Sequence, residues 1–334
     1  MRVNARSSRS ARDESGAIAV IVALVSIVLF AGAAFAIDAG NVWQTRRQMV
    51  TASDASALAA AGRYAEGGDG CATTAAATLA ANRGDATLED CLPAAGTDEG
   101  HVTVRGSTTA DFTFAGVFGL DDTEVESATT AEWGIPSGVR GLRPFGLCID
   151  ANQQLKTWLN LPAGPTGPSG TVEITYGKAQ PDACGTDAPG NWGVLDLDGG
   201  SNSNADTKEW TLNGYPGTVS VGDLVAGDTG AFSNSLNSEL ATLKASGDLF
   251  PLPVFDQVSG NGSNARFRIR AFVYVRLLAY KTTGSQANRS LTLQFDRGVV
   301  AGTCCGSGPD TGVRVVRICD VDTTAPDTTD PRAC

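Results

Sequence analysis

Residues 17–37 read AIAVIVALVSIVLFAGAAFAI, and this stretch decides how the chain is organised. It contains no charged residue, and Ser26 carries its only polar side chain. At a rise of about 1.5 Å per residue, a helix of this length is about 30 Å long, which matches the hydrocarbon core of a bilayer. The sequence therefore predicts one transmembrane helix over residues 17–37.

The flanks of this helix predict its orientation. Four arginines precede it, namely Arg2, Arg6, Arg9 and Arg12. Because cytoplasmic flanks collect Arg and Lys, we expect residues 1–16 to form a cytoplasmic basic segment and the chain from Asp38 onward to lie outside. An alternative is that residues 34–36 (AFA) form a signal-peptidase site, so that cleavage after Ala36 releases a secreted protein. The uncharged run is longer than the roughly 7–15 residues of the apolar h-region in a signal peptide, which favours the anchor.

The charge balance restricts the partners of the outer part. The chain has 334 residues and a formal net charge of −11, and residues 1–16 hold four arginines and two acidic residues, which leaves −13 for the rest. Binding to nucleic acid needs a basic surface that neutralises phosphates. Nucleic acid is therefore not expected as a partner.

All eight cysteines follow the hydrophobic segment. They are Cys71, Cys91, Cys148, Cys184, Cys304, Cys305, Cys319 and Cys334. An even number confined to the exported side is typical of disulfides in an oxidising compartment. A metal site is the rival interpretation, but there is no CxxC pair and His101 is the only histidine. Proximity suggests the pairs Cys71 with Cys91 and Cys148 with Cys184, although spacing alone does not choose among the pairings.

The helix is expected to continue beyond the membrane. Residues 41–62, NVWQTRRQMVTASDASALAAAG, are rich in alanine and contain no proline, and their apolar and small residues recur with a helical period. This narrow face either packs on the core of the same chain or docks against helices of neighbouring subunits. The candidate docking positions on this helix are Trp43, Met49, Val50, Ser53, Ala57 and Ala60.

The remaining pattern predicts an α+β protein with two outer domains. Residues 38–134 are expected to form a small, pilin-like α/β module, with helices over 73–82 and 111–120 and strands over 102–104 and 124–133. The Gly/Pro-rich residues 134–144 indicate a boundary. Residues 145–320 predict a mostly-β, disulfide-bearing domain, and residues 321–334 predict a mobile tail. The expected elements of this domain are strands over 171–176, 192–197, 218–221, 253–255, 266–280 and 291–295 and a helix over 233–243.

The sequence offers only weak candidates for catalytic, nucleotide-binding or metal-binding motifs. His101 has no serine-rich elbow beside it, and there is no GxSxG, Walker loop or GxGxxG. The loop from Asp196 to Asp206 offers oxygen ligands for Ca²⁺, but it lacks EF-hand spacing and suits an ordinary turn equally well. The arginine row along 266–276 is expected to pair with acidic side chains or to be solvated. No catalytic, cofactor-binding or metal-binding residue is therefore predicted.

The first part of the chain resembles a known family. Residues 15–61 resemble the start of TadE/TadG-like Flp (Tad) pilus-assembly proteins, of the actinobacterial type. The positions that carry the resemblance are Gly16, Asp38, Gly40, Trp43, Arg46, Arg47, Gln48, Asp54, Ala57, Leu58, Ala59 and Ala60. Ile21 stands where prepilin-like precursors carry Glu, and the chain lacks the Asp-x-Ser-x-Ser motif of von Willebrand A-type domains. Prepilin processing and metal-dependent adhesion are therefore not implied.

The resemblance implies a function without catalysis. It points to a membrane-anchored accessory protein of a Tad-type pilus or secretion system, which acts by docking and display. Its expected partners are the membrane, proteins of that machinery and a cell-surface ligand of unidentified chemistry. Two alternatives remain open at this point. One is an anchored or secreted envelope hydrolase, which would need paired carboxylates on the β domain, where Asp196 and Asp198 form only a weak pair. The other is a binding module unrelated to pili.

Overall fold

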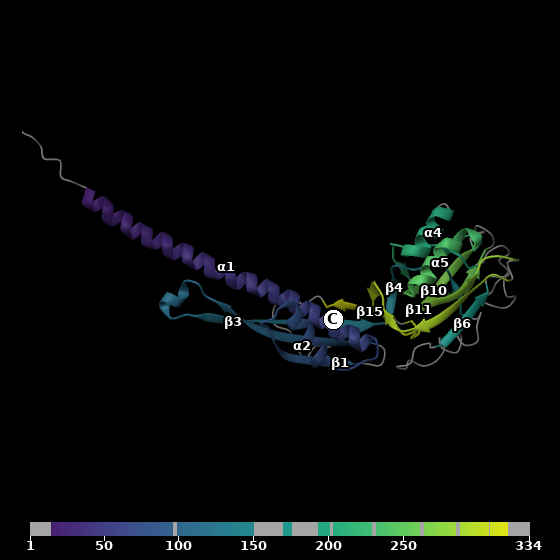
Figure 1. The fold of residues 1–334 in the computed structure, drawn as a ribbon, viewed down its shortest axis with the longest axis horizontal. Helices are drawn as coiled ribbons and strands as arrows, with labels where there is room; N and C mark the ends of the chain where they lie inside the picture. The colour runs from purple at the N-terminus through teal and green to yellow at the C-terminus, as the bar shows by residue number, and fades with distance from the viewer. Residues whose placement is uncertain are drawn as a thin grey trace, which may run out of the picture.

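One helix of 51 residues, α1 (Ser15–Ala65), dominates the computed structural model of the chain (Figure 1). The structure describes residues 15–95, 99–149, 170–175, 193–200, 203–228, 232–260, 264–284, 288–306 and 308–319. The first half of α1 stands free of the rest of the chain, and an 18-residue apolar window in it has no buried residue. The helix is therefore long and apolar enough to cross a membrane, and it continues unbroken through the predicted exit at Asp38.

The second half of α1 lies on a sheet, and together they form the first module. The elements that follow α1 are α2 (Cys71–Asn82), β1 (Thr87–Ala95), β2 (Gly100–Asp111), η1 (Ala115–Phe118) and β3 (Asp122–Gly134). Strands β2 and β3 form a long antiparallel hairpin, paired from Gly100 opposite Trp133 to Asp111 opposite Asp122. Buried and exposed residues alternate along β2, so one face of the hairpin covers α1.

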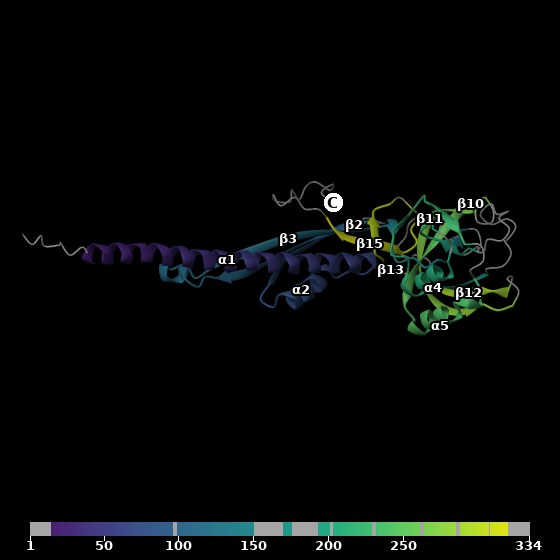
Figure 2. The same cartoon turned by 90° about the horizontal axis from the view of Figure 1, so that it is seen from above.

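Two strands from the end of the chain complete this sheet. Its order is β1-β2-β3-β15-β13, where β13 is Gly298–Val299 and β15 is Val313–Ile318. Strand β15 runs antiparallel to β3 and pairs Val315 with Gly134. The chain therefore leaves the first module after residue 134 and returns to it in β13 and β15, as Figure 2 shows. The expected boundary at 134–144 is thus not the only connection between the first module and the region that follows.

The intervening elements build a second body, here called the head region (residues 136–297 and 300–312). Its elements are β4 (Pro136–Val139), β5 (Leu147–Cys148), β6 (Gly170–Thr175), β7 (Leu195–Asp196), α4 (Asn204–Asn213), β8 (Val219–Ser220), β9 (Leu224–Gly227), η2 (Asn234–Leu236), α5 (Asn237–Ser246), β10 (Leu249–Ser259), β11 (Arg266–Lys281), β12 (Ser290–Asp296) and β14 (Gly302–Cys304). The main sheet has the order β5-β10-β11-β12-β6, with β9 on β11 and β7 on β9, and β14-β4-β8 form a small sheet.

The core of the head region lies on both sides of strand β11. Its residues alternate strictly from Arg266 to Ala271, with Phe267 and Ile269 buried between exposed arginines. From Ala271 to Val275 both faces are covered, because α5 packs on one side and the small sheet lies on the other. This is the strand that the alternating sequence predicted most clearly, and its position at the centre of the sheet explains the pattern.

Most expected elements are present, with differences that have physical reasons. The predicted helix over 111–120 is wrong: Asp111 ends β2, and only the 3₁₀ turn η1 follows. The side chains of Phe114 and Val117 are exposed there. Strands β1 and β15 and helix α4 were not predicted. Strands of mixed polarity acquire their pattern of buried and exposed residues only from the strands they pair with.

Disulfides are present as expected from the even cysteine count. Cys71, the first residue of α2, is bonded to Cys91 on β1, which confirms the first proposed pair. Cys304 is bonded to its neighbour Cys305, a pairing that was not predicted. Cys148 and Cys319 are also disulfide-bonded. Cys184 and Cys334 lie outside the described residues, as does the tail 321–334.

The Cys71–Cys91 bond should stabilise the first module measurably. It closes a loop with a sequence separation of 20 residues, for which the chain-entropy estimate is about 3 kcal/mol. Replacing both residues by alanine should lower the free energy of unfolding by about 2–4 kcal/mol. Thermal or denaturant unfolding of the double variant measures this, and a stability equal to wild type would contradict it.

Candidate docking surface

The inner face of α1 beyond Asp38 is the core of the first module. Met49, Ser53, Ala57 and Ala60 are fully buried and belong to the segment of α1 that packs on β2 and β3. Gly106 on β2 permits this approach, because a Cβ there would lie 2.7 Å from the Met49 Cε atom. The structure thus places most of the predicted small-residue face against the chain's own sheet. These four residues are not available to another protein while the module is folded.

Polar and aromatic contacts hold the sheet in register with this face. The Thr129 hydroxyl donates to the Asp54 carboxylate (2.8 Å), and Tyr64 stacks on Trp133 with ring centroids 5.2 Å apart. Asp54 is one of the positions that carry the family resemblance, and Trp133 lies near the end of β3. Their contacts are therefore structural within this chain.

The outer face of α1 is open, and it carries the other two candidate residues. Trp43 is 62% exposed, and the Arg47 guanidinium lies over its ring at 4.9 Å from the centroid, as expected for residues one helical turn apart. Val50, one further turn along, is 41% exposed. Trp43, Arg47 and Val50 are here called the outer ridge, and they form a continuous apolar and cationic surface.

A shallow groove runs along the outer ridge toward the apolar half of α1. Its volume is about 830 Å³ and it is wide open to solvent. It is lined by Ile37, Gly40, Asn41, Trp43, Gln44, Arg47, Gln48, Thr51 and Thr113. The lining is mixed in polarity, which suits contact with another protein surface better than enclosure of a small molecule.

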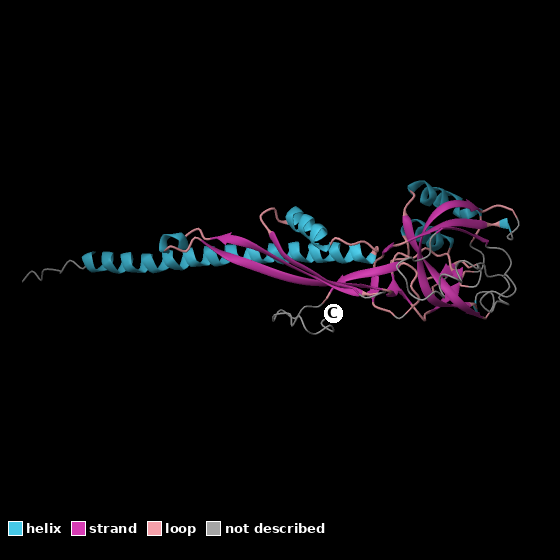
Figure 3. Cartoon of the chain, turned by 90° about the horizontal axis from the view of Figure 1, so that it is seen from below, coloured by secondary structure: helices cyan, strands magenta, loops and turns pink. Residues whose placement is uncertain are grey.

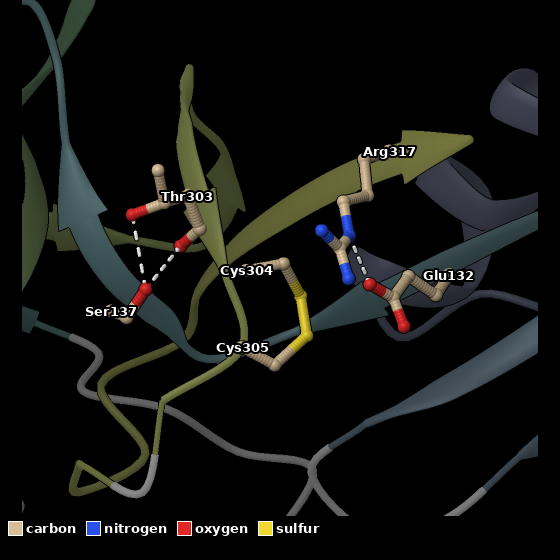
Figure 4. The surroundings of a disulfide bond; sticks show 6 residues. All are labelled: Glu132, Ser137, Thr303, Cys304, Cys305 and Arg317. Atoms are coloured by element: carbon tan, nitrogen blue, oxygen red, sulfur yellow. Dashed lines mark hydrogen bonds and ion pairs between the residues drawn. A yellow bond between two sulfur atoms is a disulfide. The ribbon is translucent and has the colours of Figure 1, made fainter. Parts of the chain in front are cut away.

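A second cluster of reactive groups lies where the two bodies join (Figure 4). Within the described residues, the Cys304 and Cys305 sulfurs and a Glu132 oxygen lie within 4.8 Å of one another, a spacing that suits metal ligands. The three potential ligand groups are already bonded, the two sulfurs to each other and the Glu132 carboxylate to Arg317. The Ser137 hydroxyl, 3.0 Å from the Thr303 carbonyl, ties β4 to β14 beside them.

The acidic loop considered for Ca²⁺ is divided by the fold. Asp196 is buried on β7 and contacts Asp198, whose carboxylate accepts the Gly200 N–H. Asp206 instead belongs to the first turn of α4, where its N–H donates to the Ser203 hydroxyl (3.1 Å) as part of the helix cap. The three carboxylates do not converge on one point.

Burial and the hydrogen bond with Asp198 raise the pKa of Asp196 to about 6. The folded chain therefore holds a proton that the unfolded chain loses near pH 4, and stability falls as the pH rises from about 4 to about 6. Asp196→Asn should raise the free energy of unfolding above pH 6 by up to about 3 kcal/mol and have little effect near pH 4. Unfolding curves of both proteins at the two pH values test this, and an equal difference at both would contradict it.

The other sequence candidates have ordinary environments. Arg268 pairs with Asp256 through two hydrogen bonds of 2.8 and 2.9 Å, so this member of the arginine row is matched within the sheet. His101 lies on β2 opposite Glu132 on β3, partly exposed.

Sequence reasoning missed one contact, made by Asp38. Its carboxylate accepts hydrogen bonds from the backbone N–H groups of residues 113–115, in the loop between β2 and β3. In the sequence, Asp38 marks the start of the outer part and is one of the positions that carry the family resemblance. The loop that it holds is far away in sequence, so the pattern around Asp38 carried no sign of it.

These features define a class of α+β protein that has one N-terminal apolar helix. The continuation of this helix beyond Asp38 is buried against the sheet on one face and exposed to solvent on another. Comparison with protein families agrees. Residues 16–63, which lie within α1, match the family model "Tad: Putative Flp pilus-assembly TadE/G-like". Searches of curated proteins and of solved structures found no match. The family match supports involvement in Flp pilus assembly.

Proposed function

We propose that the protein is a membrane-anchored accessory component of a Tad/Flp-type pilus assembly or secretion system, and that it acts by docking and display. One observation supports this most directly: the helix that matches the pilus-assembly family is covered by its own sheet on one face only. The outer ridge of Trp43, Arg47 and Val50 remains open just beyond the apolar segment. The family match also favours a role without catalysis.

Helix packing provides the mechanism of docking. Gly32, Ala36 and Gly40 follow one another at four-residue intervals, and a Cβ added at Gly32 or Gly40 would meet no atom of the chain within 4 Å. Small residues at this spacing let two helices approach closely in a membrane. We propose that a helix of the pilus machinery packs along this line and continues onto the outer ridge, with the groove beside it.

The proposed topology places the head region away from the membrane. Residues 1–16 would be cytoplasmic, residues 17–37 would span the bilayer, and everything from Asp38 on would lie outside. The exposed apolar side chains of α1 up to Ile37, the basic first segment and the disulfides all fit this arrangement. In it, the head region is displayed at the end of α1 opposite the membrane, where it can meet a ligand.

The membrane span is tested by charges in its middle. Replacing Leu24 and Val25 by Asp should prevent membrane retention, since each charge at the bilayer centre costs about 2.5–3.5 kcal/mol on insertion scales. The wild-type chain should resist carbonate extraction, and intact cells should expose residues beyond Asp38 to protease. Mature protein that begins at Ile37 in the medium would instead show cleavage after Ala36.

Docking is tested by comparing the two faces of α1. Trp43→Ala with Val50→Ala should lower the number of surface fibres, or export by the system, toward the level of a gene deletion. The free energy of unfolding should change by less than about 1 kcal/mol, because both residues are on the surface. Ala57→Leu on the buried face should instead destabilise the first module by about 1–3 kcal/mol through overpacking.

The control variant is Leu224→Ala, which removes an exposed apolar side chain from the head region without touching α1. It should leave fibre number unchanged. The assignment would be refuted if, in an organism with a working Tad system, complete deletion of the gene left fibres, adhesion and export at wild-type levels.

A further inference from the structure

The loop between β2 and β3, residues 112–121, is the part of the first module closest to the apolar half of α1. Contacts along the hairpin show its direction: Thr129 meets Asp54, the Asp111 carbonyl accepts from Asn41 (2.7 Å), and residues 113–115 meet Asp38. The hairpin thus runs back along α1 toward its N-terminal end. Figures 2 and 3 show the loop with η1 lying beside α1, past the ends of the strands.

Asp38 fixes the loop at this level. One carboxylate oxygen accepts from the Thr113 N–H (2.7 Å) and the other from the Ala115 N–H (2.7 Å), and the Phe114 N–H lies 3.1 and 3.2 Å from the two. Such charge-assisted bonds to several backbone groups hold a loop in one conformation. Because Asp38 directly follows the uncharged segment, the loop is held where α1 leaves the bilayer in the proposed topology.

The loop presents large apolar side chains outward at this point. Val117 is 84% exposed, Leu120 is 59% exposed and Phe114 is 41% exposed. They occupy one short connection, whereas connections between strands are usually polar when they face water. The exposed carboxylates of Asp111 and Asp122 lie at the base of the loop, where β2 ends and β3 begins, and the neighbouring Asp121 is exposed as well.

We propose that loop 112–121 inserts into the interfacial layer of the membrane that α1 spans, on the outer side. The inference rests on the proposed topology, and the partner is lipid: glycerol and the first acyl carbons around Val117 and Leu120, with Asp111 and Asp122 at headgroup level. Continuity with the span supports lipid as the occupant, since Asp38 places the loop beside the surface that is already in the bilayer. The loop provides a second membrane contact beside α1, which restricts the tilt and rotation of the first module.

The test uses an introduced indole as a depth reporter in the full chain, reconstituted into phosphatidylcholine/phosphatidylglycerol vesicles. Trp43→Phe lowers the background, and Val117→Trp or Leu120→Trp is added to it. Both sites are exposed, so folding should be retained, and the unfolding curve verifies this. In vesicles with brominated acyl chains, each introduced indole should lose most of its added emission, shift to shorter wavelength, and be protected from iodide.

Two further variants make the outcomes distinguishable. Val28→Trp, in the middle of the apolar segment, should be quenched by brominated lipid if α1 spans the bilayer, and Leu224→Trp, on the head region, should be quenched by iodide alone. Quenching at residue 28 with iodide access at residues 117 and 120 would overturn the inference and leave the span intact, with the loop facing water or a protein. Absence of lipid quenching at residue 28 would overturn the topology and the inference with it.

Discussion

The packing of one face of α1 against the β2–β3 hairpin is the interaction on which the rest of the structure depends. It uses Met49, Ser53, Ala57 and Ala60, whose small or flexible side chains let the sheet approach the helix axis closely. The absence of a side chain at Gly106 is needed for the same reason. Because the hairpin occupies this face, the rotation of α1 is set, and Trp43, Arg47 and Val50 are left exposed beside it.

The two parts of α1 therefore differ in how they are covered. Up to Ile37 its side chains are apolar and exposed on every face, which fits the proposed membrane span, and beyond Asp38 only one face is covered by the sheet. Asp38 lies at the change, and its carboxylate binds the backbone of the loop that lies nearest the apolar half. In the proposed topology, the open face of α1 lies just outside the membrane, which is consistent with the proposed docking.

The head region is connected to the first module by paired strands as well as by the chain between β3 and β4. Strand β15 returns to pair with β3, and its buried Arg314 forms an ion pair with Asp310 at 2.7 Å. The Cys304–Cys305 disulfide lies against Gly134, where β3 ends, and a Cβ at Gly134 would come 2.5 Å from the Cys305 sulfur. Strands β13 and β15 and the turn that holds Cys304 and Cys305 thus connect the head region to the sheet that packs on α1.

The sequence by itself determined the features that repeat along the chain. The uncharged run from Ala17 to Ile37 predicts an apolar helix long enough to span a membrane, and the alternation around Phe267 and Ile269 predicts a strand with one buried face. The even cysteine count predicts disulfides, and the proximity of Cys71 and Cys91 suggests one pair, which the structure contains. Only the tertiary structure decided which face of α1 is open, that β15 belongs to the first sheet, and that Asp38 holds a loop at residues 113–115. These depend on contacts between segments about 70 to 180 residues apart, and periodicity cannot report them because it describes one segment at a time.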